Sequence, residues 1–364
     1  MFSDPRVSVV MTVYNGVAHL PQAIGSVLAQ TFKNLELVIV DDASTDASVA
    51  CIRRYTDPRI RLSCNERNIG QAPSLNRGLA LARAPYVARL DQDDCCLPDR
   101  LQKQVVLLDA RPDIAVVGTL MWGMALARRR VDLLGRTMGN YGTFVGSLLL
   151  GICPVCHPSV MFRREVVADA GGYDESFAPA EDVELWTKLA LRRHNAYVIP
   201  EPLMLYRVHA GQQSVTKAAV QRRNIRRAQA RMIEPFCPPP ARQGVQLLLS
   251  QEDQFWAEYG SQERFIEVCE SLHETLTNLQ EALRMSPQER AALTRMMDRW
   301  LGPGVRLAPA MARWPSALFA PAVRALSPLL VPRVRPALAR LAGPIRRLRG
   351  MLMAGKPLMS FKEA

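Results

Sequence analysis

The chain has few of the features that mark secreted, disulfide-linked proteins. Only 8 of its 364 residues are cysteines, too few for a disulfide scaffold in a chain of this length. The first residues, MFSDPRVSVV, lack the separate apolar stretch of a secretory signal, because Asp4 and Arg6 stand directly before a predicted strand. We therefore expect a cytoplasmic protein whose thiols are reduced.

A second pair of cysteines at zinc spacing is also missing. Cys153 and Cys156 form a single C-x-x-C pair beside His157. One such pair cannot supply the four protein ligands of a structural zinc ion. We therefore do not expect zinc at this pair.

Charged side chains are absent from residues 137–162, which contain no Asp, Glu, Lys or Arg. The stretch is long enough to cross a bilayer. Glycines at 139, 142, 146 and 151 and prolines at 154 and 158 interrupt it, so it is not a continuous apolar helix. We expect a buried segment of loop and strand instead.

Acidic residues are nearly absent from the end of the chain. Residues 301–364 carry 11 Lys or Arg and one acid, Glu363, so the net charge of +12 leaves only +2 for the first 300 residues. Prolines at 303, 309, 315, 321 and 327 prevent one long helix there. This tail suits either attachment to an anionic membrane surface or a solvated, partly disordered segment. We do not expect it to bind nucleic acid, because the sequence contains no known nucleic-acid reading module.

The first 120 residues alternate strand and helix patterns. Almost continuous apolar stretches at 7–14 and 35–42 predict strands that are covered on both faces, and 59–64 and 85–90 continue the series. Helical patterns near 46–55 and 71–83 separate these strands. We therefore predict an α/β fold with a mostly parallel sheet, whose ligand site lies beyond the carboxyl ends of the strands.

The pattern changes past about residue 215. A basic helical pattern is followed by residues 245–301, which read as entirely helical. Ser286, Pro287 and Glu289 predict a capping box at the start of one of these helices. We accordingly divide the chain into an α/β domain (1–215), a helical region (216–301) and a basic tail (302–364).

The segment ARLDQDD (88–94) places three carboxylates within four residues at the end of a predicted strand. Asp91 and Asp93 are two residues apart, so they point the same way in an extended chain. A Mg²⁺ or Mn²⁺ ion that also binds phosphate oxygens would relieve their repulsion. The alternative is that these acids cap the helix that begins near Pro98, which would explain Asp99 and Asp94 but not the matched pair.

Five blocks of the sequence, in order, resemble a family 2 glycosyltransferase of the GT-A fold. They are VSVVMTVYNG (7–16), SVLAQTFKNLELVIVDDASTD (26–46), NIGQAPSLNRGLALARAPYVARLDQDD (68–94), GGYDESFAPAEDVELW (171–186) and YRVHAGQQS (206–214). The resemblance covers about residues 5–215. It implies a Rossmann-like nucleotide-sugar-binding sheet, with an α-helical C-terminal region beyond it.

The resemblance also implies residues for the nucleotide sugar. Thr12, Tyr14 and Asp42 match positions that hold the nucleoside in the family. Asn76 and Arg77 fall in the block before the acidic cluster, and the resemblance implies a role for them in binding the donor. UDP is the nucleotide we favour, because it is the commonest donor nucleotide in such families.

The metal ligands are implied in the same way. Asp91 matches the first acid of a D-x-D motif, near the ribose, and Asp93 matches the acid that binds the metal on the diphosphate. His209 is either a further ligand, as in some relatives, or a packed residue. Cys95 and Cys96 depart from the family's apolar residues, and we expect them to pack as small hydrophobes.

Transfer of a sugar requires a base that takes the proton of the acceptor hydroxyl. In EDVELWTKLALRR (181–193), Asp182 leads an apolar stripe, whereas Glu181 lies about 100° away around the helix. This geometry selects Asp182 as the base, and the resemblance implies the same residue. The alternative is that Asp182 is a first-turn acid that interacts with the helix dipole. We expect His157 to shape the acceptor pocket.

The sequence thus predicts an inverting, metal-dependent glycosyltransferase. It would move a sugar from a nucleotide diphosphate to a glycan or lipid-linked acceptor in surface polysaccharide assembly. A nucleotidyltransferase or sugar-nucleotide hydrolase is an alternative, but a nucleotidyltransferase should show a Gly-rich basic signature where this chain has TVYNGVAHLPQAI. A non-catalytic glycan- or nucleotide-binding module is another, and the intact Asp91, Asp93 and Asp182 argue against it.

Overall fold

The structure is a computed structural model that describes residues 4–125, 130–250, 253–259 and 261–301. The predicted basic tail (302–364) lies outside the described residues. The strands are β1 (Val7–Val13), β2 (Leu35–Asp41), β3 (Ile60–Cys64), β4 (Tyr86–Arg89), β5 (Cys95–Cys96), β6 (Ile114–Ala125), β7 (Arg130–Leu134), β8 (Met161–Arg163) and β9 (Asn195–Arg207).

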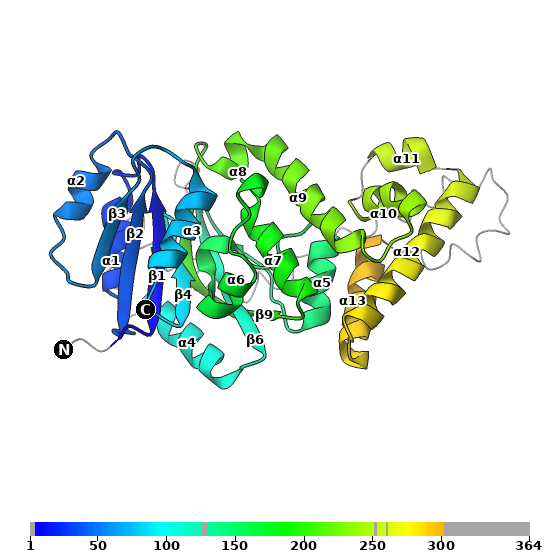
Figure 1. Cartoon of the computed structure of the whole chain (residues 1–364), viewed down its shortest axis with the longest axis horizontal. Coiled ribbons are helices and arrows are strands. Elements are labelled where there is room, and N and C mark those ends of the chain that lie inside the picture. The colour runs from blue at the N-terminus through cyan, green and yellow to red at the C-terminus, as the bar shows by residue number, and fades with distance from the viewer. Residues whose placement is uncertain (1–3, 126–129, 251–252, 260, 302–364) are drawn as a thin grey trace.

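Helices and strands are interspersed up to β9, as the sequence predicts for the first 120 residues. After β9 the described elements are helices. They are α1 (Leu20–Leu28), α2 (Ser48–Arg53), α3 (Gln71–Leu81), α4 (Arg100–Ala110), α5 (Tyr141–Leu149), α6 (Arg164–Asp169), α7 (Glu181–Leu191), α8 (Gln213–Thr216), α9 (Ala218–Ile233), α10 (Arg242–Leu249), α11 (Asp253–Tyr259), α12 (Gln262–Ala282) and α13 (Pro287–Leu301). Figure 1 shows the sheet at one end of the molecule and α10–α13 at the other.

The sheet has the order β3-β2-β1-β4-β8-β6-β9-β5, with β7 paired to β6. The strands β3, β2, β1 and β4 are parallel, which confirms the predicted α/β fold. The second half is mixed, because β8 runs antiparallel to both β4 and β6. A three-residue strand such as β8 is too short to give a periodic sequence signal, so the prediction of a mostly parallel sheet missed this reversal.

Apolar side chains from the two faces of the sheet form two separate cores. Val7, Val9 and Met11 of β1 pack with α1 and α4, whereas Val10 of the same strand packs with α3 and the helices that follow. Successive side chains of a strand point to opposite faces, so both faces of β1 must be covered. This burial keeps the strand ends fixed and leaves the loops beyond them to form a site.

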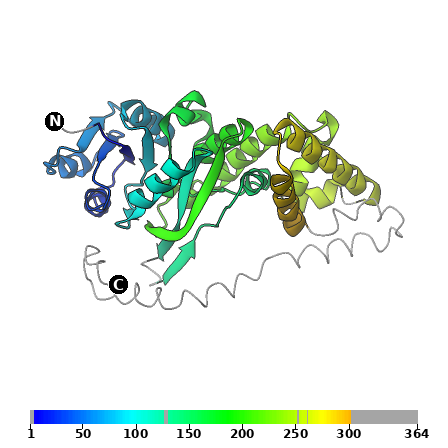
Figure 2. The ribbon, with the colours of Figure 1, turned by 90° about the horizontal axis from the view of Figure 1, so that it is seen from below.

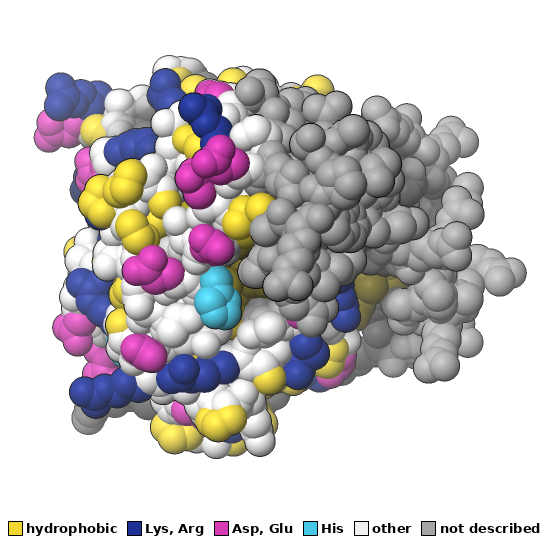
Figure 3. Space-filling view, turned by 90° about the vertical axis from the view of Figure 1, so that its right-hand side faces the viewer, with side chains coloured by type: hydrophobic (Ala, Val, Ile, Leu, Met, Phe, Trp, Pro, Cys, Tyr) yellow, Lys and Arg dark blue, Asp and Glu magenta, His cyan; other side chains and the backbone are white. Residues whose placement is uncertain are grey.

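The helical region shares the second core with the α/β domain. Buried side chains of α9, α10, α12 and α13 belong to the same apolar cluster as those of α5 and α7. Figure 2, in which the molecule is turned by 90°, shows the same helices extending away from the sheet. On the face at the helical end, described side chains of both charges are scattered among apolar ones, with no large area of one sign among them (Figure 3).

The capping box predicted at the start of α13 is confirmed. The Ser286 amide donates to Glu289 Oε2 at 2.7 Å, and the Glu289 amide donates to Ser286 Oγ at 3.3 Å. Glu289 also pairs with Arg193 at 2.7 Å, which joins α13 to the end of α7. The predicted helix boundary therefore also forms a contact between the two parts of the chain.

The uncharged stretch at 137–162 is buried, but the expectation of loop and strand alone was wrong. It contains the helix α5, which Asn140 caps by accepting a hydrogen bond from the Thr143 amide at 3.0 Å. None of the helices in the described ranges is long and apolar enough to cross a membrane. Glycines in α5 let α13 approach closely, since a Cβ added at Gly142 would lie 2.0 Å from the Glu289 carbonyl oxygen.

Gly142→Ala should therefore destabilise the protein by about 1–3 kcal/mol, the usual cost of overpacking a close contact. The matched control is Gly139→Ala, because a Cβ at Gly139 meets nothing within 4 Å. Urea unfolding of both variants measures the difference. Equal stability of the two variants would show that the α5–α13 contact is not as close as described.

Candidate active site

The acidic cluster lies just beyond β4 and is built around a buried arginine. Arg89, only 1% exposed, is the last residue of β4, and its Nη2 donates to Asp91 Oδ1 at 2.5 Å. Its Nη1 donates to the Leu90 carbonyl. Burial raises the pKa of Asp91, and the Arg89 charge opposes this rise. A carboxylate in this position depends on the guanidinium to remain ionised.

Asp93 and His209 face one another beside this pair. His209 Nε2 lies 2.8 Å from Asp93 Oδ2, and the two side chains are 38% and 23% exposed. The end of β9 fixes the loop, because Arg207 Nε donates to the Asp93 carbonyl and the Arg207 amide donates to Asp94 Oδ1, both at 2.9 Å. Residues 93 and 207–209, far apart in the sequence, therefore meet at one point.

Asp94 is the buried member of the cluster. Burial first, and then the charges of Asp91 and Asp93, raise its pKa well above the ordinary value. Its Oδ2 has no hydrogen-bond partner. Neither Asp94, which bonds to Arg207, nor Asp99 makes a side-chain cap to α4. Asp99 stands at the N-cap position of α4, where negative charge is favoured, although its side chain makes no capping hydrogen bond. Capping still leaves the pair Asp91 and Asp93 unexplained.

The side chains of Asp93 and His209 fit a divalent cation. A carboxylate oxygen and an imidazole nitrogen converge, and more carboxylate charge lies close by at Asp91. Within the described ranges, no group of three or more His, Cys, Asp or Glu is arranged to hold a metal ion. A cation here would thus take its other ligands from phosphate oxygens and water, as Mg²⁺ and Mn²⁺ usually do.

The residues expected to hold the nucleoside lie at the neighbouring strand ends. Thr12 is half-buried at the end of β1, and Tyr14, 46% exposed, follows it. The Tyr14 amide donates to Gln92 Oε1 at 2.9 Å, and Gln92 Nε2 donates back to the Tyr14 carbonyl at 3.2 Å. Gln92 thereby ties the loop after β1 to the acidic cluster.

Asp42 is buried at the end of β2 and organises the loop before α3. It accepts hydrogen bonds from Asn65 Nδ2 at 2.8 Å, from the Ile69 amide at 2.9 Å and from the Gly70 amide at 2.8 Å. An ionised carboxylate has about four acceptor positions. The protein contacts occupy three of them, which leaves capacity for one ligand donor.

Asn76 and Arg77 of α3 make their hydrogen bonds to loops around the site. The Asn76 side chain donates to the carbonyl and accepts from the amide of Tyr173, both at 2.9 Å. Arg77 Nη1 donates to Asn65 Oδ1 at 2.7 Å. These contacts hold loops in place, and their partners do not belong to the acidic cluster.

The Glu181–Asp182 pair begins α7 on the other side of the site. Asp182 Oδ1 accepts from the Val183 amide at 2.8 Å, and Oδ2 accepts from the Cys153 thiol at 3.6 Å. Burial raises the pKa of Asp182, and the Asp91 charge adds to the rise. The two acidic motifs are therefore close enough to influence each other's ionisation.

Glu181 is more enclosed than the helical spacing predicts. It is 4% exposed, its Oε2 has no hydrogen-bond partner, and burial, followed by the Asp182 charge, raises its pKa to about 7. Helical spacing predicts which side chains share a face of a helix. Both acids lie in the first turn of α7, where Glu181 is buried and Asp182 is half-buried.

His157 is also buried, and its Nε2 lies 2.8 Å from Tyr173 Oη.

Sequence reasoning missed the residues that hold the acids. Of these residues, Arg89 is the one that the sequence could have revealed, because it is the one cation in the apolar strand pattern PYVARL. Arg207 and Gln92 carry no comparable signal, because their partners come from distant parts of the sequence.

Comparison with known proteins agrees with this arrangement. Residues 8–171 match the model of the family described as Glycosyl transferase family 2. EpsE of Bacillus subtilis (strain 168), a protein named as a glycosyltransferase, is 35% identical over 208 residues, which cover 56% of this chain and 73% of EpsE. The chain belongs to glycosyltransferase family 2.

The chain is also similar to a second curated protein over part of its length, and to a solved structure in its fold. The succinoglycan biosynthesis protein ExoO of Rhizobium meliloti (strain 1021) is 41% identical over 106 residues, 29% of this chain and 30% of ExoO. The crystal structure of S. aureus TarS 1-349 in complex with UDP-GlcNAc aligns with a TM-score of 0.55 at 18% identity, over 88% of this chain and 90% of the TarS 1-349 chain. The predicted GT-A fold and nucleotide-sugar-dependent glycosyltransferase class are thus confirmed, and the nucleotidyltransferase alternative is set aside.

Arg89→Met should lower the free energy of unfolding of this family 2 enzyme by about 2–3 kcal/mol. This is somewhat less than the cost of removing one partner of a fully buried ion pair, because the Asp91 side chain is 29% exposed. Arg6→Met is the control, since Arg6 and Asp109 form an exposed pair (46% and 41%) that should contribute less than about 1 kcal/mol. Urea unfolding at neutral pH measures both. Equal losses in the two variants would contradict a structural role for the Arg89 charge.

Glu181→Gln should stabilise the ligand-free enzyme at high pH. Folding raises the pKa of Glu181 from 4.5 to about 7, so the folded state binds the proton more tightly and loses stability as pH rises through that window. The variant avoids this loss, by on the order of 2–3 kcal/mol at pH 8, and its advantage should shrink towards pH 5. Melting temperatures in EDTA at several pH values test this, with the exposed Glu175→Gln as control. An advantage that is independent of pH would contradict the interpretation.

Proposed function

We propose that this family 2 enzyme is inverting and metal-dependent, and that it transfers a sugar from a nucleoside diphosphate to a glycan or lipid-linked acceptor. One observation supports this most strongly. The acids after β4 and the acids that begin α7 lie within electrostatic reach of one another, since the Asp91 charge raises the pKa of both Asp182 and Glu181. This proximity supports a donor-binding group and a base acting on two sides of one site.

Asp182 is the base in this proposal. It takes the proton of the acceptor hydroxyl while the oxygen bonds to the anomeric carbon. The bond from that carbon to the diphosphate oxygen breaks, and the nucleoside diphosphate leaves with the electron pair. Burial favours this role, because a carboxylate with a raised pKa accepts a proton more readily. Direct attack opposite the leaving group inverts the anomeric carbon.

Asp93 and His209 would hold the cation, with Asp91 beside them near the ribose. A bound Mg²⁺ or Mn²⁺ would supply charge stabilisation to the diphosphate. Arg89 orients Asp91 through the 2.5 Å contact, and Arg207 holds the backbone of Asp93 through its carbonyl. The protein thus positions the acids before the donor arrives.

UDP is the nucleotide we propose, and surface polysaccharide assembly is the proposed setting. TarS, which shares the fold, was crystallised with UDP and with UDP-GlcNAc, and ExoO is named as a succinoglycan biosynthesis protein. Attachment of the basic tail to an anionic membrane surface remains a prediction about residues outside the described part of the chain.

Two substitutions separate donor binding from transfer. Asp93→Asn should reduce Mn²⁺-dependent binding of UDP at least tenfold, because it removes a ligand charge. Asp182→Asn should bind UDP and Mn²⁺ normally and lose at least a hundredfold in transfer, because the amide cannot accept the proton. Calorimetry measures UDP binding, and release of UDP from a UDP-sugar measures turnover.

Asp113→Asn is the control, since that carboxylate is on the surface and 54% exposed. Near-normal turnover by Asp182→Asn would contradict the base assignment. Unchanged metal-dependent binding by Asp93→Asn would remove the proposed metal site.

A further inference from the structure

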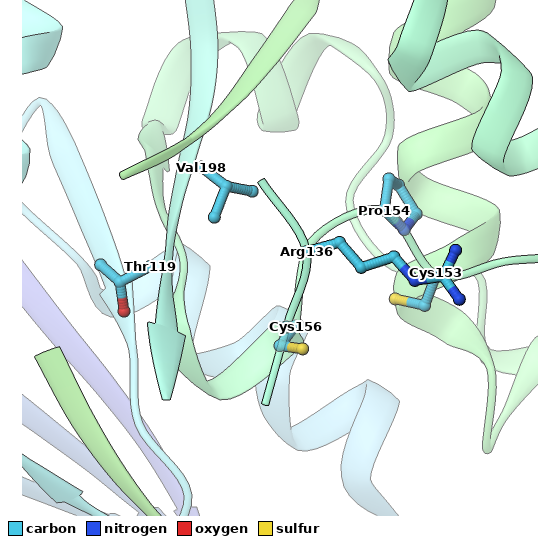
Figure 4. A pocket seen from close by; sticks show the side chains of 7 residues that line it. Thr119, Arg136, Cys153, Pro154, Cys156 and Val198 are labelled. Carbon is cyan, nitrogen blue, oxygen red and sulfur yellow. The ribbon is translucent and has the colours of Figure 1, made fainter. Parts of the chain in front are cut away.

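A cavity of about 180 Å³ lies on the base side of the site, outside the residues assigned to the donor. Its lining side chains are Thr119, Arg136, Cys153, Pro154, Cys156 and Val198, shown in Figure 4. They come from β6, from β9, from the segment after β7 and from the loop after α5. The cavity has room for far more than one water molecule.

One wall of this cavity is bonded directly to the proposed base. Cys153 lines the cavity and donates its thiol hydrogen to Asp182 Oδ2 at 3.6 Å. Burial, and then the Asp182 charge, raise the pKa of Cys153, so the thiol keeps its hydrogen. A thiol is a weak donor. An acceptor hydroxyl that reaches Asp182 can therefore take over this contact at little cost.

Arg136 gives the cavity its charge. Its side chain is exposed and extends towards Cys153 in the view of Figure 4. In the described part of the chain, Arg136 forms neither a hydrogen bond nor an ion pair, whereas most arginines around the site are paired. A free guanidinium at a cavity is suited to a planar or tetrahedral anion, which it binds through two parallel hydrogen bonds.

We propose that this cavity is an acceptor subsite that binds an anionic group of the acceptor, a phosphate or a carboxylate, with Arg136 as the counter-ion. This inference rests on the proposed function, because it assigns a substrate to the site of Asp182. Thr119, Val198 and Pro154 enclose the cavity, and Cys153 marks where the acceptor hydroxyl meets the base. The acceptor is then a negatively charged sugar or a phosphate-linked one.

The test uses three probes of similar size: glucose 6-phosphate, glucuronate and neutral glucose. Calorimetry on the full chain should show at least tenfold tighter binding of one or both anionic probes than of glucose. The anion that binds better distinguishes phosphate from carboxylate. Arg136→Gln should abolish the preference, and Arg54→Gln, which removes an exposed cation at the C-terminal end of α2, should retain it. Equal binding of all three probes by the wild type, or an unchanged preference in Arg136→Gln, would overturn the proposal.

A variant that fills the cavity places the bound probe. Val198→Phe adds volume at the cavity wall, so it should weaken binding of the preferred probe at least tenfold and leave binding of UDP with Mn²⁺ unchanged. Unchanged probe binding by Val198→Phe would overturn the assignment of this cavity. Binding of UDP with Mn²⁺ is measured on the same samples. If UDP does not bind, the proposed function fails; if UDP binds and the anion preference is absent, only the acceptor subsite fails.

Discussion

An excess of carboxylate charge around one buried guanidinium is the constraint on which the site depends. Asp91, Asp93 and Asp94 follow one strand, and Glu181 and Asp182 begin a helix that faces them. Arg89 neutralises only one of these charges. Burial raises the pKa values of Asp94, Glu181 and Asp182, so the ligand-free site carries electrostatic strain. A cation with a bound diphosphate would relieve that strain, and the raised pKa of Asp182 suits the proposed role of this residue as the base.

The strands and helices that carry these acids are held in place by the two cores that cover the two faces of the sheet. The parallel strands β1, β2 and β4 end at one edge, and the end of β9 fixes the acidic loop through Arg207. On the other side, α7 packs among α5 and α9 in a core that extends to α13. The proposed base, Asp182, thus stands on a helix that packs against the helical region. This packing links the helical region to the candidate active site.

Local patterns in the sequence predicted the strand ends, the acidic cluster, the capping box of α13 and the family. They could not predict Arg207 on the acidic loop or Cys153 on Asp182, because those contacts join segments more than twenty residues apart. The helix α5 was missed because its glycines read as breakers, whereas they permit a close helix contact. Helical spacing put Glu181 about 100° away from the inward-facing Asp182, but Glu181 is itself buried, in the first turn of α7.

The most direct test of this account is the melting temperature of the full chain with UDP and Mn²⁺, compared with UDP and EDTA. A ligand that binds only the folded state raises the melting temperature by mass action. The account predicts a clear rise with UDP and Mn²⁺ that disappears in EDTA, because the carboxylates repel the diphosphate unless a cation lies between them. A rise of equal size in EDTA would contradict the account, as would no rise with any of the UDP, GDP and dTDP nucleotides.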